Sequence, residues 1–175
     1  MSYKYAITSA MQSLAYDPKI RFVGYGVKIG GQALGTLKEI KEEQLVETPV
    51  AENLMVGMAI GMSLAGLKPV VFIERMDFIL NALDAIVNHL SQAKAISRGE
   101  FSPAMILRVV VGNRAKPLFT GPTHTQDFSH CIAGMVGFPV RQVTRETEFA
   151  PIYDHAKACL DRGESTMVVE YKDLM

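Results

Sequence analysis

The apolar residues of this chain recur in two patterns, one typical of helices and the other of buried strands. Between residues 3 and 15 they fall three and four positions apart, which predicts an amphipathic helix. Shorter, continuous apolar runs predict strands that are buried on both faces of a parallel sheet. These predicted strands cover residues 20–23, 45–46, 70–73, 104–111, 140–143 and 166–170.

Stretches with helical spacing separate the predicted strands. They cover residues 53–66, 77–95, 126–135 and 146–162, with a short solvated helix at 38–44. The alternation predicts an α/β fold, a doubly wound and mainly parallel sheet with helices on both faces. Ligands of such sheets bind beyond the carboxyl ends of the strands. The long loop 112–126, which follows a predicted strand, is therefore a candidate functional segment.

One segment, Thr48-Pro49-Val50-Ala51-Glu52, precedes the helix predicted at 53–66. Pro49 suits the first helical position, so we expect a helix to begin there with Thr48 as its cap. The acid of a capping box would stand at Ala51, and Glu52 lies one place further on. Glu52 thus has no capping role and becomes a candidate for chemistry. The simpler interpretation is a first-turn acid that complements the helix dipole.

The helix predicted at 53–66 carries small residues at regular spacing. Gly57, Gly61 and Ala65 follow one another at intervals of four, which places them on one face. Such a stripe lets another backbone approach closely, and it lowers the helix propensity at each glycine. Packing or a bound ligand is therefore expected to compensate.

Composition places the chain among globular proteins and predicts a single domain over residues 1–175. Apolar residues make up 49% and charged residues 21%, and 18 basic residues balance 18 acidic ones. This balance predicts neither a nucleic acid nor an anionic membrane as partner. The start of the chain lacks the apolar core of a signal peptide and no run has the length of a membrane span, so we expect a cytoplasmic protein. Cys131 and Cys159 have no metal-ligand spacing and are expected to be reduced thiols.

Other motifs carry weaker signals. Gly24, Gly26 and Gly30 follow a predicted strand, as in a dinucleotide-binding loop, but the third glycine is one residue late and no helix pattern follows. His124, Asp127 and His130 have three-residue spacing, which is common by chance, so no metal site is predicted. A histidine in a loop at a strand end contacts ligands more often than a core histidine does, although a plain surface position is the commoner outcome.

Taken in order, several segments resemble one family. Thr48 to Glu52 resembles its Asp-Thr-Pro-Ile-Ala/Ser-Glu, and Ala65-Gly66-Leu67-Lys68-Pro69 resembles its Ala-Gly-Leu-Arg-Pro. Asp77-Phe78 resembles the start of its next helix, and His124-Thr125-Gln126 resembles its His-Ser-Gln. The family is the pyrimidine-binding domain of thiamine-diphosphate enzymes, the central region of transketolase. The likeness is greatest to the beta subunit of the 2-oxo acid (pyruvate) dehydrogenase decarboxylase component.

This resemblance implies roles for four residues. The acid that matches Glu52 hydrogen-bonds the ring nitrogen of the cofactor's aminopyrimidine, and so promotes removal of the thiazolium proton. Phe78 matches the aromatic that packs on the pyrimidine ring. His124 matches a histidine that faces the substrate. Glu74 matches a residue that lines the pyrimidine pocket, although the family has an uncharged side chain there.

Three departures from the family accompany the resemblance. At the end of the first strand the family has Gly-Glu-Asp-Val, whereas this chain has Gly24-Tyr25-Gly26-Val27 and lacks both acids. The Gly-Asp-Gly motif that holds the diphosphate through Mg²⁺ does not occur in these 175 residues. We also expect no counterpart of the family's carboxy-terminal domain. The resemblance therefore implies a split enzyme, in which a separate alpha-type subunit binds the diphosphate and Mg²⁺, built on a dimer of this chain.

The resulting hypothesis is a subunit of a thiamine-diphosphate enzyme that acts on a 2-oxo acid or a ketose such as a sugar phosphate. The reaction class is decarboxylation, or ketol or acyl transfer. A second hypothesis is a non-catalytic binding or regulatory partner that retains the fold, motivated by the residues at Tyr25 and Glu74. An unrelated nucleotide-binding α/β domain is a third. The residues alone name neither donor nor acceptor.

Overall fold

The computed structural model describes residues 2–175, in which six strands form one sheet with every neighbouring pair parallel. Their order across the sheet is β2-β1-β3-β4-β6-β5. The strands are β1 (Ile20–Gly24), β2 (Leu45–Glu47), β3 (Lys68–Ile73), β4 (Ile106–Val111), β5 (Val140–Gln142) and β6 (Thr166–Tyr171). The chain adds β2 on one side of β1 and β3 on the other, so the winding reverses beside β1.

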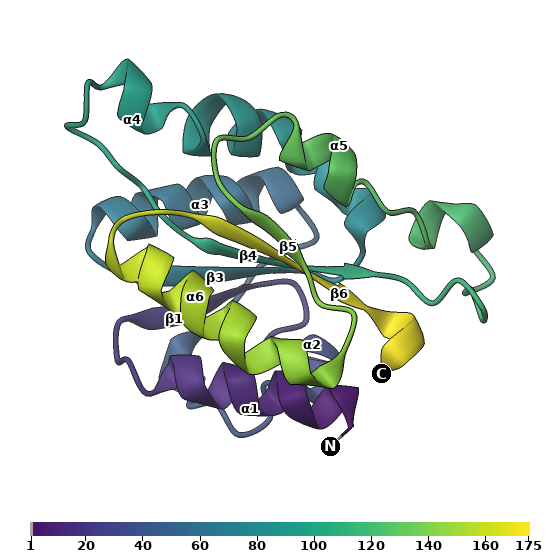
Figure 1. Cartoon of the computed structure of the whole chain (residues 1–175). Helices are drawn as coiled ribbons and strands as arrows, with labels where there is room; N and C mark the ends of the chain where they lie inside the picture. The colour runs from purple at the N-terminus through teal and green to yellow at the C-terminus, as the bar shows by residue number, and fades with distance from the viewer. Residues whose placement is uncertain (1) are drawn as a thin grey trace.

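Helices cover both faces of this sheet (Figure 1). One face carries α1 (Tyr3–Ala15) and α6 (Phe149–Asp161), which pack with β1, β3, β4 and β6 in one apolar core. The opposite face carries α3 (Glu52–Leu64) and α5 (Ser129–Ala133) over a second core. Every residue of β4 and β6 is buried, as expected for strands covered on two sides. The predicted doubly wound α/β fold is confirmed.

The prediction of one regular α-helix over residues 77–95 is wrong. The segment consists of a 3₁₀ helix, η2 (Met76–Ala82), a π-helical stretch, η3 (Ala85–Leu90), and a short α4 (Ala93–Ile96). In the tight turns of η2 the buried apolar residues Met76, Ile79 and Ala82 lie three apart. In η3 the buried residues are Ala85, Ile86 and Leu90. Counting every apolar residue on one 3.6-residue period hid this change.

The helix after β2 begins three residues after Pro49, where its start was expected, and one residue before the range 53–66 given by apolar spacing. Ala51 is its N-cap and Glu52 its first residue, so Thr48 does not cap it. The Thr48 N–H donates to the Gly24 carbonyl oxygen at 3.1 Å, which extends the pairing of β2 with β1. Proline also disfavours the helical conformation in the residue before it. The solvated helix predicted at 38–44 shrinks to one 3₁₀ turn, η1 (Glu42–Gln44).

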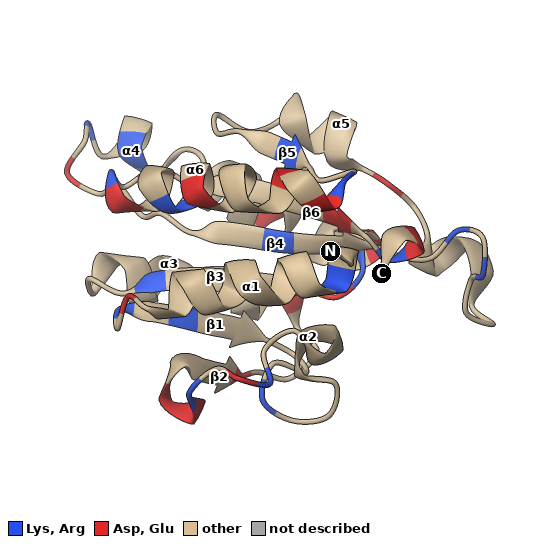
Figure 2. Cartoon of the chain, turned by 60° about the horizontal axis from the view of Figure 1, so that its bottom comes forward, with Lys and Arg blue, Asp and Glu red and all other residues tan. Residues whose placement is uncertain are grey.

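The outer surface mixes charges of both signs. Lys and Arg are intermingled with Asp and Glu over the helices and loops, and neither sign gathers on one face of the view in Figure 2. Within residues 2–175, no helix combines the length and the apolar character needed to cross a bilayer.

A buried ionic cluster joins the central strands to the helices on one face. Arg108 in β4 donates from Nε and Nη2 to the two carboxylate oxygens of Glu170 in β6, each at 3.0 Å. Its Nη1 donates to Thr36 Oγ1 at 2.9 Å, and the Tyr153 hydroxyl of α6 donates to Glu170 Oε1 at 2.7 Å. Burial and then the neighbouring Glu170 charge raise the pKa of Tyr153 well above its ordinary value. The Arg108 and Glu170 charges are both fully buried, so each needs the other to offset the cost of its removal from water.

Replacing Glu170 with Ala should therefore lower the free energy of unfolding by about 3–5 kcal/mol, because the Arg108 guanidinium would remain buried without a counter-charge. Urea unfolding followed by circular dichroism measures this loss. Glu164→Ala is the control, since Glu164 pairs with Arg162 at 2.9 Å on the exposed surface and should matter little. Equal effects of the two substitutions would contradict the prediction.

Candidate functional site

The predicted site residues lie at the carboxyl ends of the strands, where parallel strands deliver their loops to one edge of the sheet. Glu52 follows β2 at the start of α3, and Glu74 follows β3 directly. Phe78 lies in η2, and His124 ends a 3₁₀ turn, η4 (Gly121–His124), within the loop after β4. The fold thus brings residues from three separate connections to the same end of the molecule.

Glu52 is buried although it stands in the first turn of its helix. Only 6% of the residue is exposed. Asn81 Nδ2 donates to Glu52 Oε2 at 3.4 Å, and this is the one side-chain hydrogen bond of the carboxylate within residues 2–175. No cation of the described chain lies within ion-pair distance of it. A buried carboxyl with one weak partner can exchange a hydrogen bond or a proton with a ligand that reaches Oε1.

Phe78 and His124 form the closest pair among the four predicted residues. Their rings meet edge to face, with centroids 5.0 Å apart and planes at 87°. Both side chains are half-buried, so part of each ring remains accessible. Because Asn81 belongs to the same 3₁₀ helix as Phe78, η2 connects the Glu52 carboxylate to this aromatic pair.

Glu74 lies apart from that group. Its carboxylate pairs with the buried Arg75 guanidinium at 2.9 Å, and it makes no hydrogen bond to Glu52, Phe78 or His124 in the described chain. It lines a separate hollow of about 230 Å³ with Tyr25, in the loop after β1. The negative charge that departs from the family pattern is thus compensated within the chain by Arg75, which is buried beside it.

The loop after β1 is held by Glu47, a residue that sequence analysis did not single out. Its carboxylate accepts hydrogen bonds from the backbone N–H groups of Gly26 at 2.6 Å, Lys28 at 2.7 Å and Ile29 at 3.1 Å. Burial raises the pKa of Glu47, but these N–H groups outweigh it and keep the pKa below its ordinary value. The glycines that resemble a dinucleotide-binding loop are thus occupied by an internal carboxylate, which leaves less reason to expect a phosphate there.

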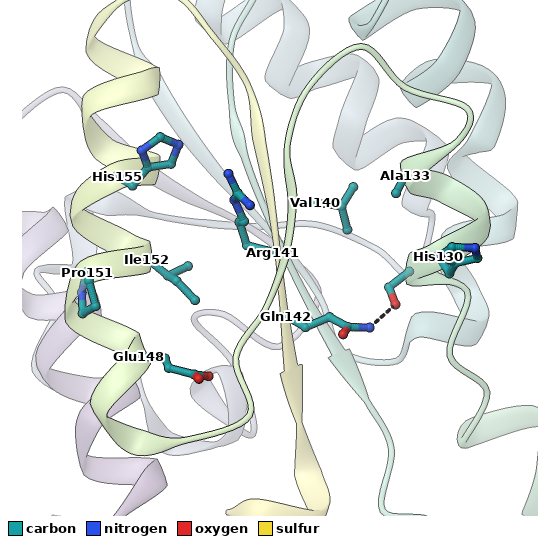
Figure 3. Close-up of a pocket in the computed structure, with 10 residues that line it drawn as sticks. His130, Ala133, Val140, Arg141, Gln142, Glu148, Pro151, Ile152 and His155 are labelled. Atoms are coloured by element: carbon teal, nitrogen blue, oxygen red, sulfur yellow. Dashed lines mark hydrogen bonds between the residues drawn. The ribbon is translucent and has the colours of Figure 1, made fainter.

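A larger hollow lies elsewhere. It has a volume of about 670 Å³ and opens between α5, α6 and the edge strand β5. Figure 3 shows its polar side chains spread around the rim, with His130 directed away from Arg141 and His155. Gln142 Nε2 donates to Ser129 Oγ at 2.6 Å, which uses two of the polar groups internally. Size alone therefore does not make this hollow the site.

The histidines and acid at three-residue spacing do not assemble a metal site. Asp127 accepts a hydrogen bond from the Tyr171 hydroxyl at 2.8 Å and one from the Ser129 N–H at 2.9 Å. Across residues 2–175, no three His, Cys, Asp or Glu side chains are placed to share a metal ion.

Two residues of the site escaped sequence analysis for different reasons. Asn81 appeared only as a polar position in a helix, and its contact with Glu52 arises because η2 folds back over the start of α3. The burial of Arg75 was not predicted, since a basic residue after a strand is expected to be exposed. It is buried instead. Both depend on tertiary structure that local spacing does not encode.

Comparisons with known proteins agree with this geometry. Residues 1–102 match the sequence model of the transketolase pyrimidine binding domain. The chain is 30% identical over 145 residues to the mitochondrial pyruvate dehydrogenase E1 component subunit beta of Saccharomyces cerevisiae, covering 80% of this chain and 39% of that protein. It is 28% identical over 117 residues to the 2-oxoisovalerate dehydrogenase subunit beta of Bacillus subtilis, covering 64% of this chain and 36% of that protein.

A solved structure shares the fold. It is described as a split gene transketolase, inactive beta4 tetramer, and superposes with a TM-score of 0.66 at 14% identity. The match covers 95% of this chain and 49% of that chain. The chain therefore spans half or less of the length of the relatives described here.

Glu47→Gln should reduce the free energy of unfolding at pH 7 by about 1 kcal/mol, because the three N–H groups bond to two carboxylate oxygens and the amide replaces one of these with an NH₂ group that cannot accept. The folded-state pKa of Glu47 is depressed. The difference between parent and variant should thus be full above the ordinary glutamate pKa of about 4.3 and should shrink as the pH falls through the lower folded value. Urea unfolding of both proteins between neutral and acidic pH checks this, since other acids cancel in the difference. A gap that stays constant or widens toward acid would contradict it.

Proposed function

The chain belongs to the family of transketolase pyrimidine-binding domains, and on that premise we propose that it is the pyrimidine-binding subunit of a split thiamine-diphosphate-dependent enzyme. The substrate is a 2-oxo acid or a ketose, and the reaction is decarboxylation or ketol or acyl transfer. The observation that carries the proposal is the buried Glu52 carboxylate, which has one weak hydrogen bond and no counter-ion in the described chain.

The residues present suit an aminopyrimidine. Thiamine diphosphate, when bound, supplies a nucleophilic carbon that adds to the carbonyl group of the donor. In this proposal Glu52 Oε1 holds a proton at a ring nitrogen, while Oε2 accepts the hydrogen bond from Asn81. Phe78 offers an aromatic face or edge that fixes the plane of a ring, and His124, whose ring is in contact with Phe78, offers a nitrogen to the substrate.

The proposed partner is an alpha-type subunit that holds the diphosphate and Mg²⁺ through the family's Gly-Asp-Gly motif, which does not occur in these 175 residues. The names of the relatives support it, because they are beta subunits, and the structural neighbour is a beta4 tetramer described as inactive. Catalysis would then need both subunits.

Self-association is proposed through the outer face of α3. The helix buries Glu52, Met55, Val56 and Ala59 on its inner side. On the outer side, a Cβ built on Gly57 or Gly61 meets no atom within 4 Å. Leu54 and Leu64 are 50% and 51% exposed. An apolar helix face with a groove at its glycines suits the close approach of a second copy of the chain.

A non-catalytic partner that keeps the fold is the second candidate. The observation that favours it is the hollow at Tyr25 and Glu74, where the side chains differ from those of the family and Glu74 is already paired with Arg75. The following experiment separates this candidate from catalysis.

Glu52→Gln, assembled with a diphosphate-binding subunit, should lower kcat for a 2-oxo acid by about 100-fold or more, because the amide cannot exchange a proton. Assembly, followed by size-exclusion chromatography, should be unchanged. Glu146→Gln is the matched control, an exposed acid in the first turn of another helical segment, and should leave kcat as it is. Full turnover in the Glu52 variant would refute the catalytic role. An assembly inactive with every donor tried would favour the non-catalytic candidate.

Gly61→Leu should abolish self-association, because the new side chain fills the groove that the second helix would occupy. The folded chain itself should be as stable as the parent or slightly more so, since leucine favours a helix over glycine by about 0.5–1 kcal/mol. Analytical ultracentrifugation gives the oligomeric state and thermal unfolding the stability. Ala95→Leu, on the exposed helix α4, is the control. A Gly61 variant that associates like the parent would exclude α3 as the interface.

A further inference from the structure

Asp77 joins two segments of the candidate site that lie far apart in the sequence. It is the second residue of η2, directly before Phe78, and is only 8% exposed. Its Oδ1 accepts a hydrogen bond from Gln126 Nε2 at 2.9 Å and one from the Gln126 backbone N–H at 3.3 Å. Gln126 follows His124 by two residues. We infer that Asp77 is a positioning residue that fixes His124 by anchoring the end of its loop, an inference that rests on the role proposed for His124.

Two other anchors flank residues 115–125: the Arg114 backbone N–H donates to Asp173 Oδ1 at 2.6 Å, and the Tyr171 hydroxyl donates to Asp127 Oδ2 at 2.8 Å. Thr123 Oγ1 donates to the Thr120 carbonyl oxygen, and the Gly121 N–H donates to that of Leu118. These bonds, like the remaining hydrogen bonds that the described chain gives residues 115–125, stay inside the 112–126 loop. The two bonds to Asp77 therefore tie this half of the loop to the rest of the fold.

Packing restricts the loop from a second side. A Cβ at Gly112, just after β4, would overlap the His124 carbonyl oxygen, so the backbone at His124 lies directly against that glycine. On the other side the His124 ring meets the Phe78 ring. Since Phe78 and Asp77 are neighbours in η2, the same short helix holds the imidazole by a ring contact and its loop by hydrogen bonds.

A purely local role does not account for Asp77. The N-cap of η2 is Arg75, and no side chain caps this helix, so Asp77 is not there to satisfy the helix end. Its second oxygen, Oδ2, is buried without a hydrogen-bond partner among residues 2–175. Burying a carboxylate in this way is unfavourable. The two hydrogen bonds from Gln126 offset part of this cost.

Hydrogen exchange on the full chain, without cofactor or partner, tests the anchor directly. Asp77→Ala should speed amide exchange over residues 118–126 by about tenfold or more, because a charged hydrogen bond and a second bond are lost together. Asp77→Asn keeps an acceptor in the same volume and should restore most of the protection. Gln126→Ala retains the backbone bond and should fall between the two.

Asp84→Ala provides the matched control, since Asp84 lies on the same segment and pairs only at the exposed surface with Asn88 and His89. It should leave exchange over residues 118–126 unchanged. Equal protection in the parent and in Asp77→Ala, or equal loosening by Asp77→Ala and Asp84→Ala, would overturn the inference.

A double-mutant cycle in the assembled enzyme tests whether Asp77 acts through His124. Asp77→Ala should lower kcat by about tenfold, and His124→Ala by about 100-fold. The double variant should be no slower than His124→Ala alone, because displacing the loop has no further effect on kcat once the His124 imidazole is absent. If the kcat loss of the double variant equalled the product of the two single losses, the inference would be overturned. An inactive parent assembly would refute the proposed function, whereas the exchange experiment would still decide the role of Asp77.

Discussion

The parallel sheet imposes the constraint on which the rest of this structure depends. A parallel pair needs a crossover between its strands, so the chain must return across one face or the other before the next strand begins. With both faces covered, the strands become largely apolar, and the two charges that β4 and β6 carry, Arg108 and Glu170, pair with each other. All connections that leave the carboxyl ends then meet at one edge, which is where Glu52, Phe78 and His124 are found.

Four acids show how this fold handles negative charge away from water. Glu170 is neutralised by a bidentate guanidinium, and Glu47 by three backbone N–H groups. Asp77 has the two N–H groups of one glutamine residue. Glu52 has a single amide at 3.4 Å. Among these four acids Glu52 thus has the weakest compensation, and its one partner, Asn81, lies in η2, the helix that also carries Phe78.

The fold class and family could be predicted from the sequence because both rest on features that repeat. Buried strands are continuous apolar runs, and the family motifs occur in order along the chain. The roles of Glu52, His124, Phe78 and Glu74 remain predictions. What spacing could not reveal was the change of helical period in η2 and η3, the late start of α3, and the contacts of Asn81, Asp77 and Arg75. The contacts of Asn81, Asp77 and Arg75 depend on tertiary packing, which no window of neighbouring residues encodes. The start of α3 has a local cause as well, since Pro49 disfavours the helical conformation at Thr48.

The two outermost strands are short, three residues each, and both carry charge: β2 ends on Glu47, and β5 has Arg141 at its centre, exposed. Short, charged edge strands of this kind disfavour strand pairing between the sheets of two molecules, which would lead to aggregation. Lateral growth of the sheet is therefore disfavoured at both ends, which leaves helices and loops as the better surfaces for an ordered oligomer.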